Sequence, residues 1–430
     1  MNLLHANDRP GSYPASWYAA TAVDAPRRVA LRGEVCVDVC VVGGGYTGLS
    51  SAWHLARQGL RVMVLEAHRV GWGASGRNGG QVGSGQRLDQ DWIAARLGRD
   101  DARHLWQIAE SAKALVCDLA RDMPGADWRP GVAHAFQHMS EVEAARRYAA
   151  HLAEDYGYDQ IAPLDRAETA GLLGTDVYAG GELDGGAAHI HPLNFALGLA
   201  RAAEAAGAVI HEDSEVLALE PGRPARLRTA AGEVRADHVI LACNGYLGGL
   251  DPKVAARVMP INNFIVATEP LGSRAPLSRP VAVADSRFVV NYWRQTPDGR
   301  LLFGGGESYG WRFPDIPATV RKPMLQVYPQ LADARIDHAW GGTLAITPTR
   351  NPCFIRPQPN VLSASGYSGH GVALATMAGQ IMAEAIAGQT ARFDVMARLP
   401  TPRFPGGTLL RHPVLVLAMT WFALRDRLGI

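Results

Sequence analysis

Residues 39–66 read VCVVGGGYTGLSSAWHLARQGLRVMVLE and contain three structural signals in order. The run from Cys36 to Val42 is short and β-branched, which is typical of a buried parallel strand. The glycine turn Gly43 to Gly48 follows it and opens a helix pattern from Thr47 to Gln58. A second apolar strand ends directly before Glu66. This order predicts a βαβ unit.

The turn matches the pattern G-x-G-x-x-G, and each glycine has a physical role in a dinucleotide site. Gly43 permits the tight turn, Gly45 lets the backbone approach a pyrophosphate, and Gly48 lets the helix pack closely on the strand. The helix N-terminus offers N–H groups and the positive end of its dipole to phosphates. Glu66 can accept hydrogen bonds from both ribose hydroxyls of an adenosine, and its charge disfavours NADP.

Two further glycine-rich segments indicate a larger cofactor than NAD. Residues 71–81, dense in small side chains, let main chain wrap a bulky planar ligand, and Ser75 and Asn78 can bond phosphate or ring edges. Residues 366–371 form a second glycine turn before a helix that starts at Val372, and its N-terminus can face the negative charge of a reduced flavin. The alternatives are a flexible surface loop and ordinary helix capping. Together the segments favour FAD.

The rest of the chain alternates helix and strand patterns. Other expected helices cover residues 101–121, 141–156, 194–206 and 372–387, and other expected strands cover residues 215–219, 237–243, 288–292, 301–303 and 361–364. Ala231-Gly232 marks a hairpin between residues 227–229 and 233–234, and residues 296–299 form a turn between two strands. Because the glycine turns lie far apart in sequence, we expect one nucleotide-binding domain that is interrupted by a second domain.

The predicted fold class is α/β with an α+β second domain. The expected FAD-binding domain comprises residues 1–90, 185–250 and 345–390, and the expected substrate domain comprises residues 91–184 and 251–344. The first is an interrupted Rossmann-like unit, and the second holds a mixed sheet that faces the flavin. Residues 391–430 form a C-terminal tail with an amphipathic helix.

Composition excludes several classes of protein. Of 430 residues 47% are hydrophobic and 19% charged, the net charge is +1, and no basic tract suggests nucleic acid. Five cysteines without a Cys-x-x-Cys pair predict reduced thiols rather than disulfides or a zinc site. We expect no metal site, since His189 and His191 precede Pro192 and indicate the start of a helix. The chain shows neither a signal-peptide pattern nor an apolar run of membrane-spanning length, which predicts a cytoplasmic protein.

Several segments together resemble the D-amino-acid oxidase superfamily of FAD enzymes, and within it the γ-glutamylputrescine oxidase branch. They are residues 41–51, Glu66, and residues 73–81, 191–194, 242–246, 292–305 and 366–371. The resemblance implies oxidation of a C–H bond beside an amine: hydride passes to flavin N5, water hydrolyses the imine, and O₂ is reduced to H₂O₂. The implied partners are a small-molecule amine and O₂. The oligomeric state stays open.

The motifs and the resemblance define the expected cofactor-binding residues. They are Gly43, Gly45, Tyr46, Thr47, Gly48, Glu66, Ala67, Arg69, Gly73, Ala74, Ser75, Arg77, Asn78, Gly79, Gly80, Gln81, Val216, Cys243, Asn244, Gly245, Gly342, Gly366, Tyr367, Gly369, His370, Gly371 and Val372.

Departures from the superfamily carry further expectations. Monomeric sarcosine oxidases attach their flavin through a cysteine whose place is taken here by Leu344, and Cys353 is misplaced, so we expect non-covalent FAD. Those relatives bind the substrate carboxylate through a lysine, here Ala373, and an arginine, whose place falls near Gly80-Gln81. Without these two carboxylate-binding side chains, the sequence favours an amine whose charged groups lie farther from the reacting nitrogen. Phe303 stands near the place of the lysine that activates O₂, which weakens the case for O₂ as acceptor.

No catalytic residue follows from the sequence, but four side chains are candidates for the substrate pocket. Trp293 and Arg294 lie on a strand expected to face the flavin, and Tyr367 and His370 lie in the second glycine turn. Aromatic faces can hold an alkylammonium chain. The alternative is that these residues are simply part of the core or of a hairpin.

Two other functions remain open at this point. The tail from Leu409 to Leu424 is amphipathic and either docks on the body of the protein or lies on a membrane surface. In the second case the protein would be a dehydrogenase or oxidase of a cyclic or secondary amino acid, such as L-pipecolate, proline or sarcosine, that passes electrons to a quinone. The last alternative is a flavin-binding protein without turnover.

Overall fold

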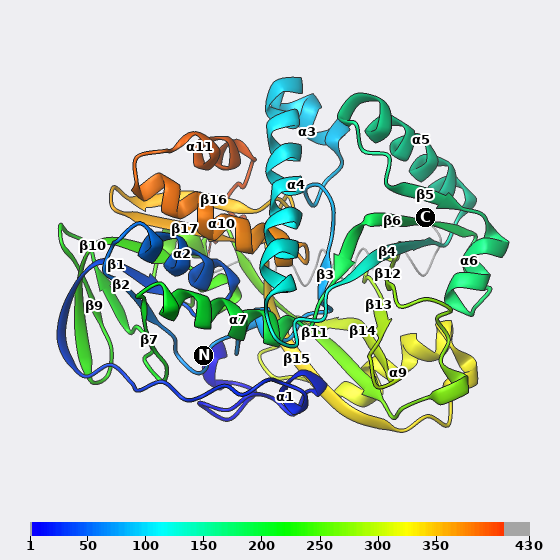
Figure 1. Ribbon diagram of the computed structural model, residues 1–430, viewed down its shortest axis with the longest axis horizontal. Helices are drawn as coiled ribbons and strands as arrows, with labels where there is room; N and C mark the ends of the chain where they lie inside the picture. The colour runs from blue at the N-terminus through cyan, green and yellow to red at the C-terminus, as the bar shows by residue number, and fades with distance from the viewer. Residues whose placement is uncertain (1, 408–430) are drawn as a thin grey trace.

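The structure, a computed structural model, describes residues 2–407 and contains two sheets that lie next to each other (Figure 1). The first sheet has eight strands and is mostly parallel, whereas the second has nine strands and is mixed. Both receive strands from distant parts of the sequence. This arrangement confirms the predicted α/β class with a mixed second sheet.

The first sheet is built around β1 (Gly33–Val42). Its order is β16-β17-β10-β1-β2-β7, with β9 beside β10 and β8 beside β9. The other strands are β2 (Val62–Leu65), β7 (Val209–His211), β8 (Ala218–Glu220), β9 (Ala225–Arg228), β10 (Gly232–Leu241), β16 (Cys353–Gln358) and β17 (Val361–Ser365). The last four residues of β1 are buried, because side chains on both faces of a central parallel strand are covered.

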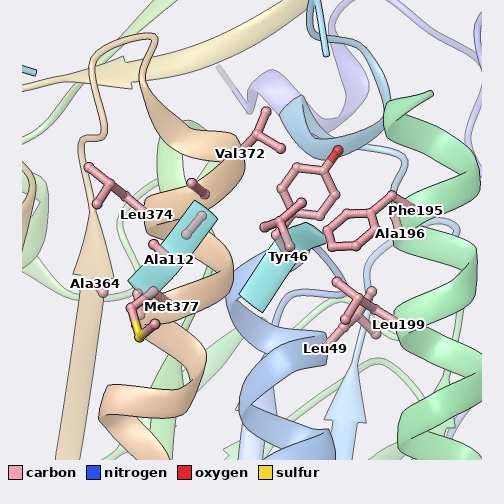
Figure 2. Close-up of a cluster of buried hydrophobic side chains, with 14 of the residues drawn as sticks. Tyr46, Leu49, Ala112, Phe195, Ala196, Leu199, Ala364, Val372, Leu374 and Met377 are labelled. Atoms are coloured by element: carbon pink, nitrogen blue, oxygen red, sulfur yellow. The ribbon is translucent and has the colours of Figure 1, made fainter. Parts of the chain in front are cut away.

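Helices α2 (Tyr46–Arg57), α4 (Arg99–Arg121), α7 (Pro192–Ala205) and α10 (Gly371–Ile386) pack into one hydrophobic core with the first sheet. Figure 2 shows part of this core, where the ring of Tyr46 on α2 lies beside Phe195 on α7. On α10, Gly379 permits close approach to α2, since a Cβ there would lie 2.5 Å from the Cβ of Ser50. The opposite face of the sheet packs against a separate core that includes Leu227 and Val254.

The second sheet has the order β15-β11-β14-β13-β12-β4-β6-β3, and β5 pairs with β6. Its strands are β3 (Gln81–Val82), β4 (Arg129–Phe136), β5 (Ile161–Leu164), β6 (Gly180–His189), β11 (Met259–Thr268), β12 (Ala282–Asp285), β13 (Tyr292–Gln295), β14 (Leu301–Ser308) and β15 (Ile336–Ile346). One face packs against α9 (Ile316–Val327) around Trp293, Phe303 and Val320. The other face of the second sheet is therefore available for contacts with the first sheet and its helices, and for a ligand.

Shorter elements complete the described chain. The helices are α1 (Trp17–Ala20), α3 (Gln90–Leu97), α5 (Met139–Tyr156), α6 (Arg166–Leu173), α8 (Pro252–Ala255) and α11 (Ala391–Arg398), and the 3₁₀ turns are η1 (Leu3–His5), η2 (Ala74–Gly76), η3 (Asn244–Tyr246), η4 (Gly272–Arg274) and η5 (Pro329–Leu331). No helix within residues 2–407 combines the length and apolarity needed to cross a membrane. The predicted amphipathic tail, residues 409–424, lies outside the described residues.

Most predicted elements are present, but several have different bounds. The strand expected at residues 215–219 is Ala218–Glu220, and the one expected at residues 301–303 runs to Ser308. The expected strands at residues 233–234 and 237–243 are one continuous strand, β10, because it pairs along its whole length with β1. The strand expected at residues 288–292 starts only at Tyr292 and runs to Gln295. The predicted start of α7 is confirmed: the His191 ring accepts a hydrogen bond from the backbone N–H of Asn194, and Pro192 stands in the first turn.

Candidate functional site

The first glycine turn leaves no room for side chains. Gly43 has φ +109°, and a Cβ on it would lie 2.7 Å from the carbonyl oxygen of Ala242. A Cβ on Gly48 would overlap the carbonyl oxygen of Gly43. On Gly45 it would lie 2.8 Å from the hydroxyl oxygen of Ser75. The glycines therefore hold the turn against its neighbours and leave only main chain at its surface, as a pyrophosphate site requires.

The N-terminus of α2 is arranged to receive an anion. Its N-cap is Gly45, which has no side chain to cap the helix, and the N–H of Tyr46 donates to Ser75 Oγ at 3.0 Å. The positive end of the helix dipole points at the same place. These groups suit the phosphates of a dinucleotide, and Ser75 links them to the glycine-rich segment 71–81.

Glu66 is buried at the end of β2 beneath this turn. Its carboxylate accepts hydrogen bonds from the N–H groups of Gly44 at 2.7 Å and His68 at 2.9 Å. Burial raises the pKa of Glu66 to about 7, although these backbone bonds oppose the shift. A buried carboxylate at this point fits the hydroxyls of an adenosine ribose, which would donate to it.

The raised pKa of Glu66 predicts a pH dependence of the cofactor-free protein. Its ordinary pKa is 4.5, so as the pH rises from about 4.5 to about 7 the unfolded chain loses the proton while the folded chain retains it. The free energy of unfolding should therefore fall over this range by about 3 kcal/mol more in the parent than in Glu66→Gln. Urea unfolding of both apoproteins across the range measures this difference, and parallel curves would contradict the assignment.

The segment from Gly73 to Gln81 is held by its own side chains. The Asn78 amide donates to the carbonyl oxygens of Ala74 and Ser75, each at 3.0 Å. Its side-chain oxygen accepts from the N–H of Gly80 at 2.7 Å. The Asn78 side chain is thus used within the loop, and the structure assigns it to fixing the loop shape rather than to a ring edge.

The two predicted cofactor-binding arginines have protein partners. Arg69 Nε lies 3.0 Å from the buried carboxylate of Glu212. Arg77 donates to Asp8 at 2.6 Å and to the carbonyl oxygen of Gly341 at 3.0 Å, and its guanidinium stacks over the ring of Trp72. Both guanidinium groups therefore hold loops of the fold together.

The second glycine turn lies against the first, although the two are far apart in sequence. The hydroxyl of Thr47 and the phenol of Tyr367 form a buried hydrogen bond of 2.7 Å. The side-chain oxygen of Asn244 accepts from the N–H of Gly366 at 3.0 Å. Three predicted segments are therefore brought to one place. Of the other predicted residues, Gly369 lies in the second glycine turn, Gly371 and Val372 begin α10, and Cys243 and Gly245 lie at and beside η3. Ala67 follows β2, Val216 lies between β7 and β8, and Gly342 lies within β15 of the second sheet.

His370 stands directly before α10 and is held in one orientation. Its Nε2 lies 3.1 Å from the carbonyl oxygen of Gly85. Burial and the neighbouring charge of Arg87 lower the pKa of His370 to about 4. The ring is therefore neutral near pH 7 and can donate from Nε2 to Gly85.

A small cavity of about 10 Å³ lies between the loop 79–81 and the second sheet. Its lining residues are Tyr18, Gly79, Gln81, Ile265, Tyr292, Trp293, Arg294, Leu302 and Gly304. Tyr292 occupies the centre: its ring fills the space left by Gly79 and Gly304, and its hydroxyl donates to Asn263 at 2.5 Å. Tyr292 falls within a segment that carries the family resemblance, but no motif identified its side chain.

The pocket candidates on β13 point to opposite faces of the sheet, as successive strand residues do. Arg294 lies on the cavity side and donates to the carbonyl oxygens of Gly79 at 3.1 Å and Ile190 at 3.2 Å. Trp293 borders the cavity, but its indole stacks on Phe303 within the second core, with ring centroids 5.5 Å apart. Phe303 therefore lies in the second core, and Trp293 is chiefly a core residue.

Comparison with known proteins identifies the family. The sequence model of the DAO family, described as FAD dependent oxidoreductase, matches residues 38–385. The chain belongs to this family. The matched range includes both glycine turns and Tyr292.

Two relatives match almost the whole chain. A probable oxidoreductase OrdL of Rhizobium meliloti (strain 1021) is 43% identical over 416 residues, which are 96% of this chain and 97% of the relative. The gamma-glutamylputrescine oxidoreductase of Escherichia coli (strain K12) is 40% identical over 427 residues, 97% of this chain and 99% of the relative.

Solved structures share the fold at lower identity. Glycine oxidase from Geobacillus kaustophilus superposes with a TM-score of 0.72 at 21% identity, covering 86% of this chain and 100% of the other. L-α-glycerophosphate oxidase from Mycoplasma pneumoniae, with FAD bound, gives a TM-score of 0.65 at 17% identity and covers 86% and 97%. This DAO-family chain is thus an FAD-dependent amine oxidoreductase.

Proposed function

We propose that the enzyme oxidises a γ-glutamylated diamine, with γ-glutamylputrescine as its substrate, and reduces O₂ to H₂O₂. The E. coli relative named for this substrate supports the proposal through 40% identity along nearly its full length. The bound FAD supplies the hydride acceptor for the amine carbon. The protein supplies the cavity and holds the amine in it.

The charge of the cavity wall carries this proposal. Among residues 2–407, Arg294 is the one charged side chain that lines the cavity, and its guanidinium already donates to main-chain oxygens and to the phenol of Tyr18. Ala373, at the place of the carboxylate-binding lysine in sarcosine oxidases, is buried in the first core. A carboxylate on the reacting carbon would therefore lack a partner beside Tyr292, which favours a substrate whose charges lie farther away.

Within this proposal the predicted site residues have defined roles. The turns Gly43–Gly48 and Gly366–Gly371 bind the dinucleotide and the flavin ring, and Glu66 binds the ribose. The cofactor stays non-covalent, since Leu344 cannot form a thioether and Cys353 is buried in a core of the first sheet. The division into a FAD-binding domain and a substrate domain, at the boundaries predicted from sequence, belongs to the same proposal.

An anaerobic flavin-reduction assay tests the substrate. The purified holoenzyme should lose its oxidised-flavin absorbance with γ-glutamylputrescine, and far more slowly with sarcosine, L-pipecolate or proline. Reoxidation with air should then produce one H₂O₂ per flavin. If only α-carboxylated secondary amines reduce the flavin, the proposed substrate is wrong. If a quinone but not O₂ reoxidises the reduced flavin, the proposed electron acceptor is wrong.

A further inference from the structure

One row of paired residues crosses the second sheet on the cavity side. Tyr292 pairs with Gly304 on one side and with Ala284 on the other. Ala284 pairs in turn with His134, and His134 pairs with Glu182. Directly paired residues point to the same face of a sheet. The row therefore leads from the cavity at Tyr292, over the small side chain of Ala284, to a charged pair on β4 and β6.

The pair at the end of this row keeps hydrogen-bonding capacity for a ligand. His134 Nδ1 lies 3.1 Å from Glu182 Oε1, which leaves the second carboxylate oxygen and the second ring nitrogen for other partners. The His134 side chain is 44% exposed and that of Glu182 is 14% exposed. Glu182 raises the pKa of His134 against the opposing effect of burial.

Arg87 is an exposed residue on the loop that follows β3. It donates from Nε to the carbonyl oxygen of Ser368, in the second glycine turn, at 3.3 Å. Its positive charge disfavours protonation of both His134 and His370. Among residues 2–407 no carboxylate forms an ion pair with Arg87, so its remaining N–H groups are open to an anion.

Other charged groups near this end do not neutralise Arg87. Two effects disfavour the charge of Arg87, namely its desolvation by the surrounding protein and the repulsion by Arg350. The attraction by Asp89 is weaker than these effects. Asp184 is already engaged, because it accepts hydrogen bonds of 2.5 Å from both Tyr158 and Ser84. Arg87 therefore has no ion-pair partner among the described residues, and the second carboxylate oxygen of Glu182 has no hydrogen bond to any of them.

The length of the row matches the substrate. With neighbouring strands about 4.8 Å apart, His134 lies about 10 Å and Glu182 about 14 Å from Tyr292. In γ-glutamylputrescine nine bonds separate the reacting nitrogen from the α-carbon of the glutamyl group, as many as in three extended residues, which span about 10 Å. An amine beside Tyr292 thus brings its amino-acid end to His134 and Glu182.

We propose that Glu182, His134 and Arg87 form the subsite for the amino-acid end of the substrate, with Glu182 binding the α-ammonium and Arg87 and His134 binding the α-carboxylate. This assignment rests on the proposed function and adds the residues that select γ-glutamylated amines over free ones. It also explains how the cavity at Tyr292, whose lining arginine is already hydrogen-bonded, can bind an amino-acid derivative.

Rapid anaerobic flavin reduction of the holoenzyme tests this subsite with two substrates. γ-Glutamylputrescine has the amino-acid end, and N-acetylputrescine keeps the same amine and amide without it. Glu182→Gln and Arg87→Gln should each raise the Kd for γ-glutamylputrescine by about 10- to 100-fold. The limiting reduction rate, the flavin spectrum and the Kd for N-acetylputrescine should stay at the parent values.

Glu154→Gln and Arg146→Gln, both exposed on α5, are matched controls that should change neither Kd. Equal losses with both substrates, or a lower limiting rate with both, would overturn the assignment by showing a structural or flavin-directed role. Unchanged Kd values in a parent that reacts with γ-glutamylputrescine would overturn the subsite alone. A parent whose flavin γ-glutamylputrescine does not reduce would overturn the proposed function as well.

Discussion

Gly48→Ala should produce a folded protein that purifies without its yellow colour. The added Cβ would overlap the carbonyl oxygen of Gly43, which is main chain and cannot move aside without opening the turn. Overpacking of this kind costs about 1–3 kcal/mol, and because the turn is the cofactor-binding surface, FAD affinity should fall by about 100-fold. The ratio of flavin to protein absorbance after purification, and the Kd of the apoprotein for added FAD, measure the effect.

Gly171→Ala is the matched control for this substitution. Gly171 lies within α6, and a Cβ there would meet no atom within 4 Å. This variant should keep its full flavin content and gain about 0.5–1 kcal/mol of stability from the better helix former. If Gly48→Ala retained as much FAD as Gly171→Ala, the first glycine turn would not be the cofactor-binding surface.

The second large effect is expected for Arg294→Met. This side chain is buried and its guanidinium bonds Gly79, Ile190 and the phenol of Tyr18. Methionine fills similar volume but leaves these acceptors without a donor, which should lower the free energy of unfolding by about 2–4 kcal/mol. Since Gly79 belongs to the loop against Tyr292, amine turnover should also fall by an order of magnitude or more.

Thermal unfolding of the holoenzyme and steady-state turnover measure both parts of this expectation. Arg226→Met, on an exposed position of β9, removes the same charge without touching the cavity and should leave both unchanged. A stable Arg294→Met protein with normal turnover would show that the loop 79–81 is held by its other contacts.

The sequence predicted the cofactor half well because its signals are local. The glycine pattern from Gly43 to Gly48 requires a fixed spacing within one turn. The apolar run of β1 indicates by itself that the strand is buried. The strand β10 was divided at Arg235 and Ala236, where its apolar pattern is interrupted, although both residues pair with β1. Polar residues in β13 had the same effect, since Arg294 is satisfied by distant main-chain oxygens.

The substrate half was less predictable because it depends on long-range register. Nothing near His134 in the sequence indicates that it faces Glu182, or that both share a row with Tyr292. A shift of one residue in any pair would turn these side chains to the other face of the sheet. The same parity explains why Trp293, on a strand expected to face the flavin, lies with Phe303 in the second core.

The hydrogen bond between Thr47 and Tyr367 has a consequence for biosynthesis. The two glycine turns of the proposed flavin site are separated by most of the chain, and α10 packs on α2 only after its residues have been synthesised. When the ribosome has synthesised the first strand, the first turn and the entire second sheet, the binding site for FAD is still incomplete. We therefore expect FAD to bind late in synthesis or after it. Chains that are truncated before Tyr367 should contain no FAD after translation.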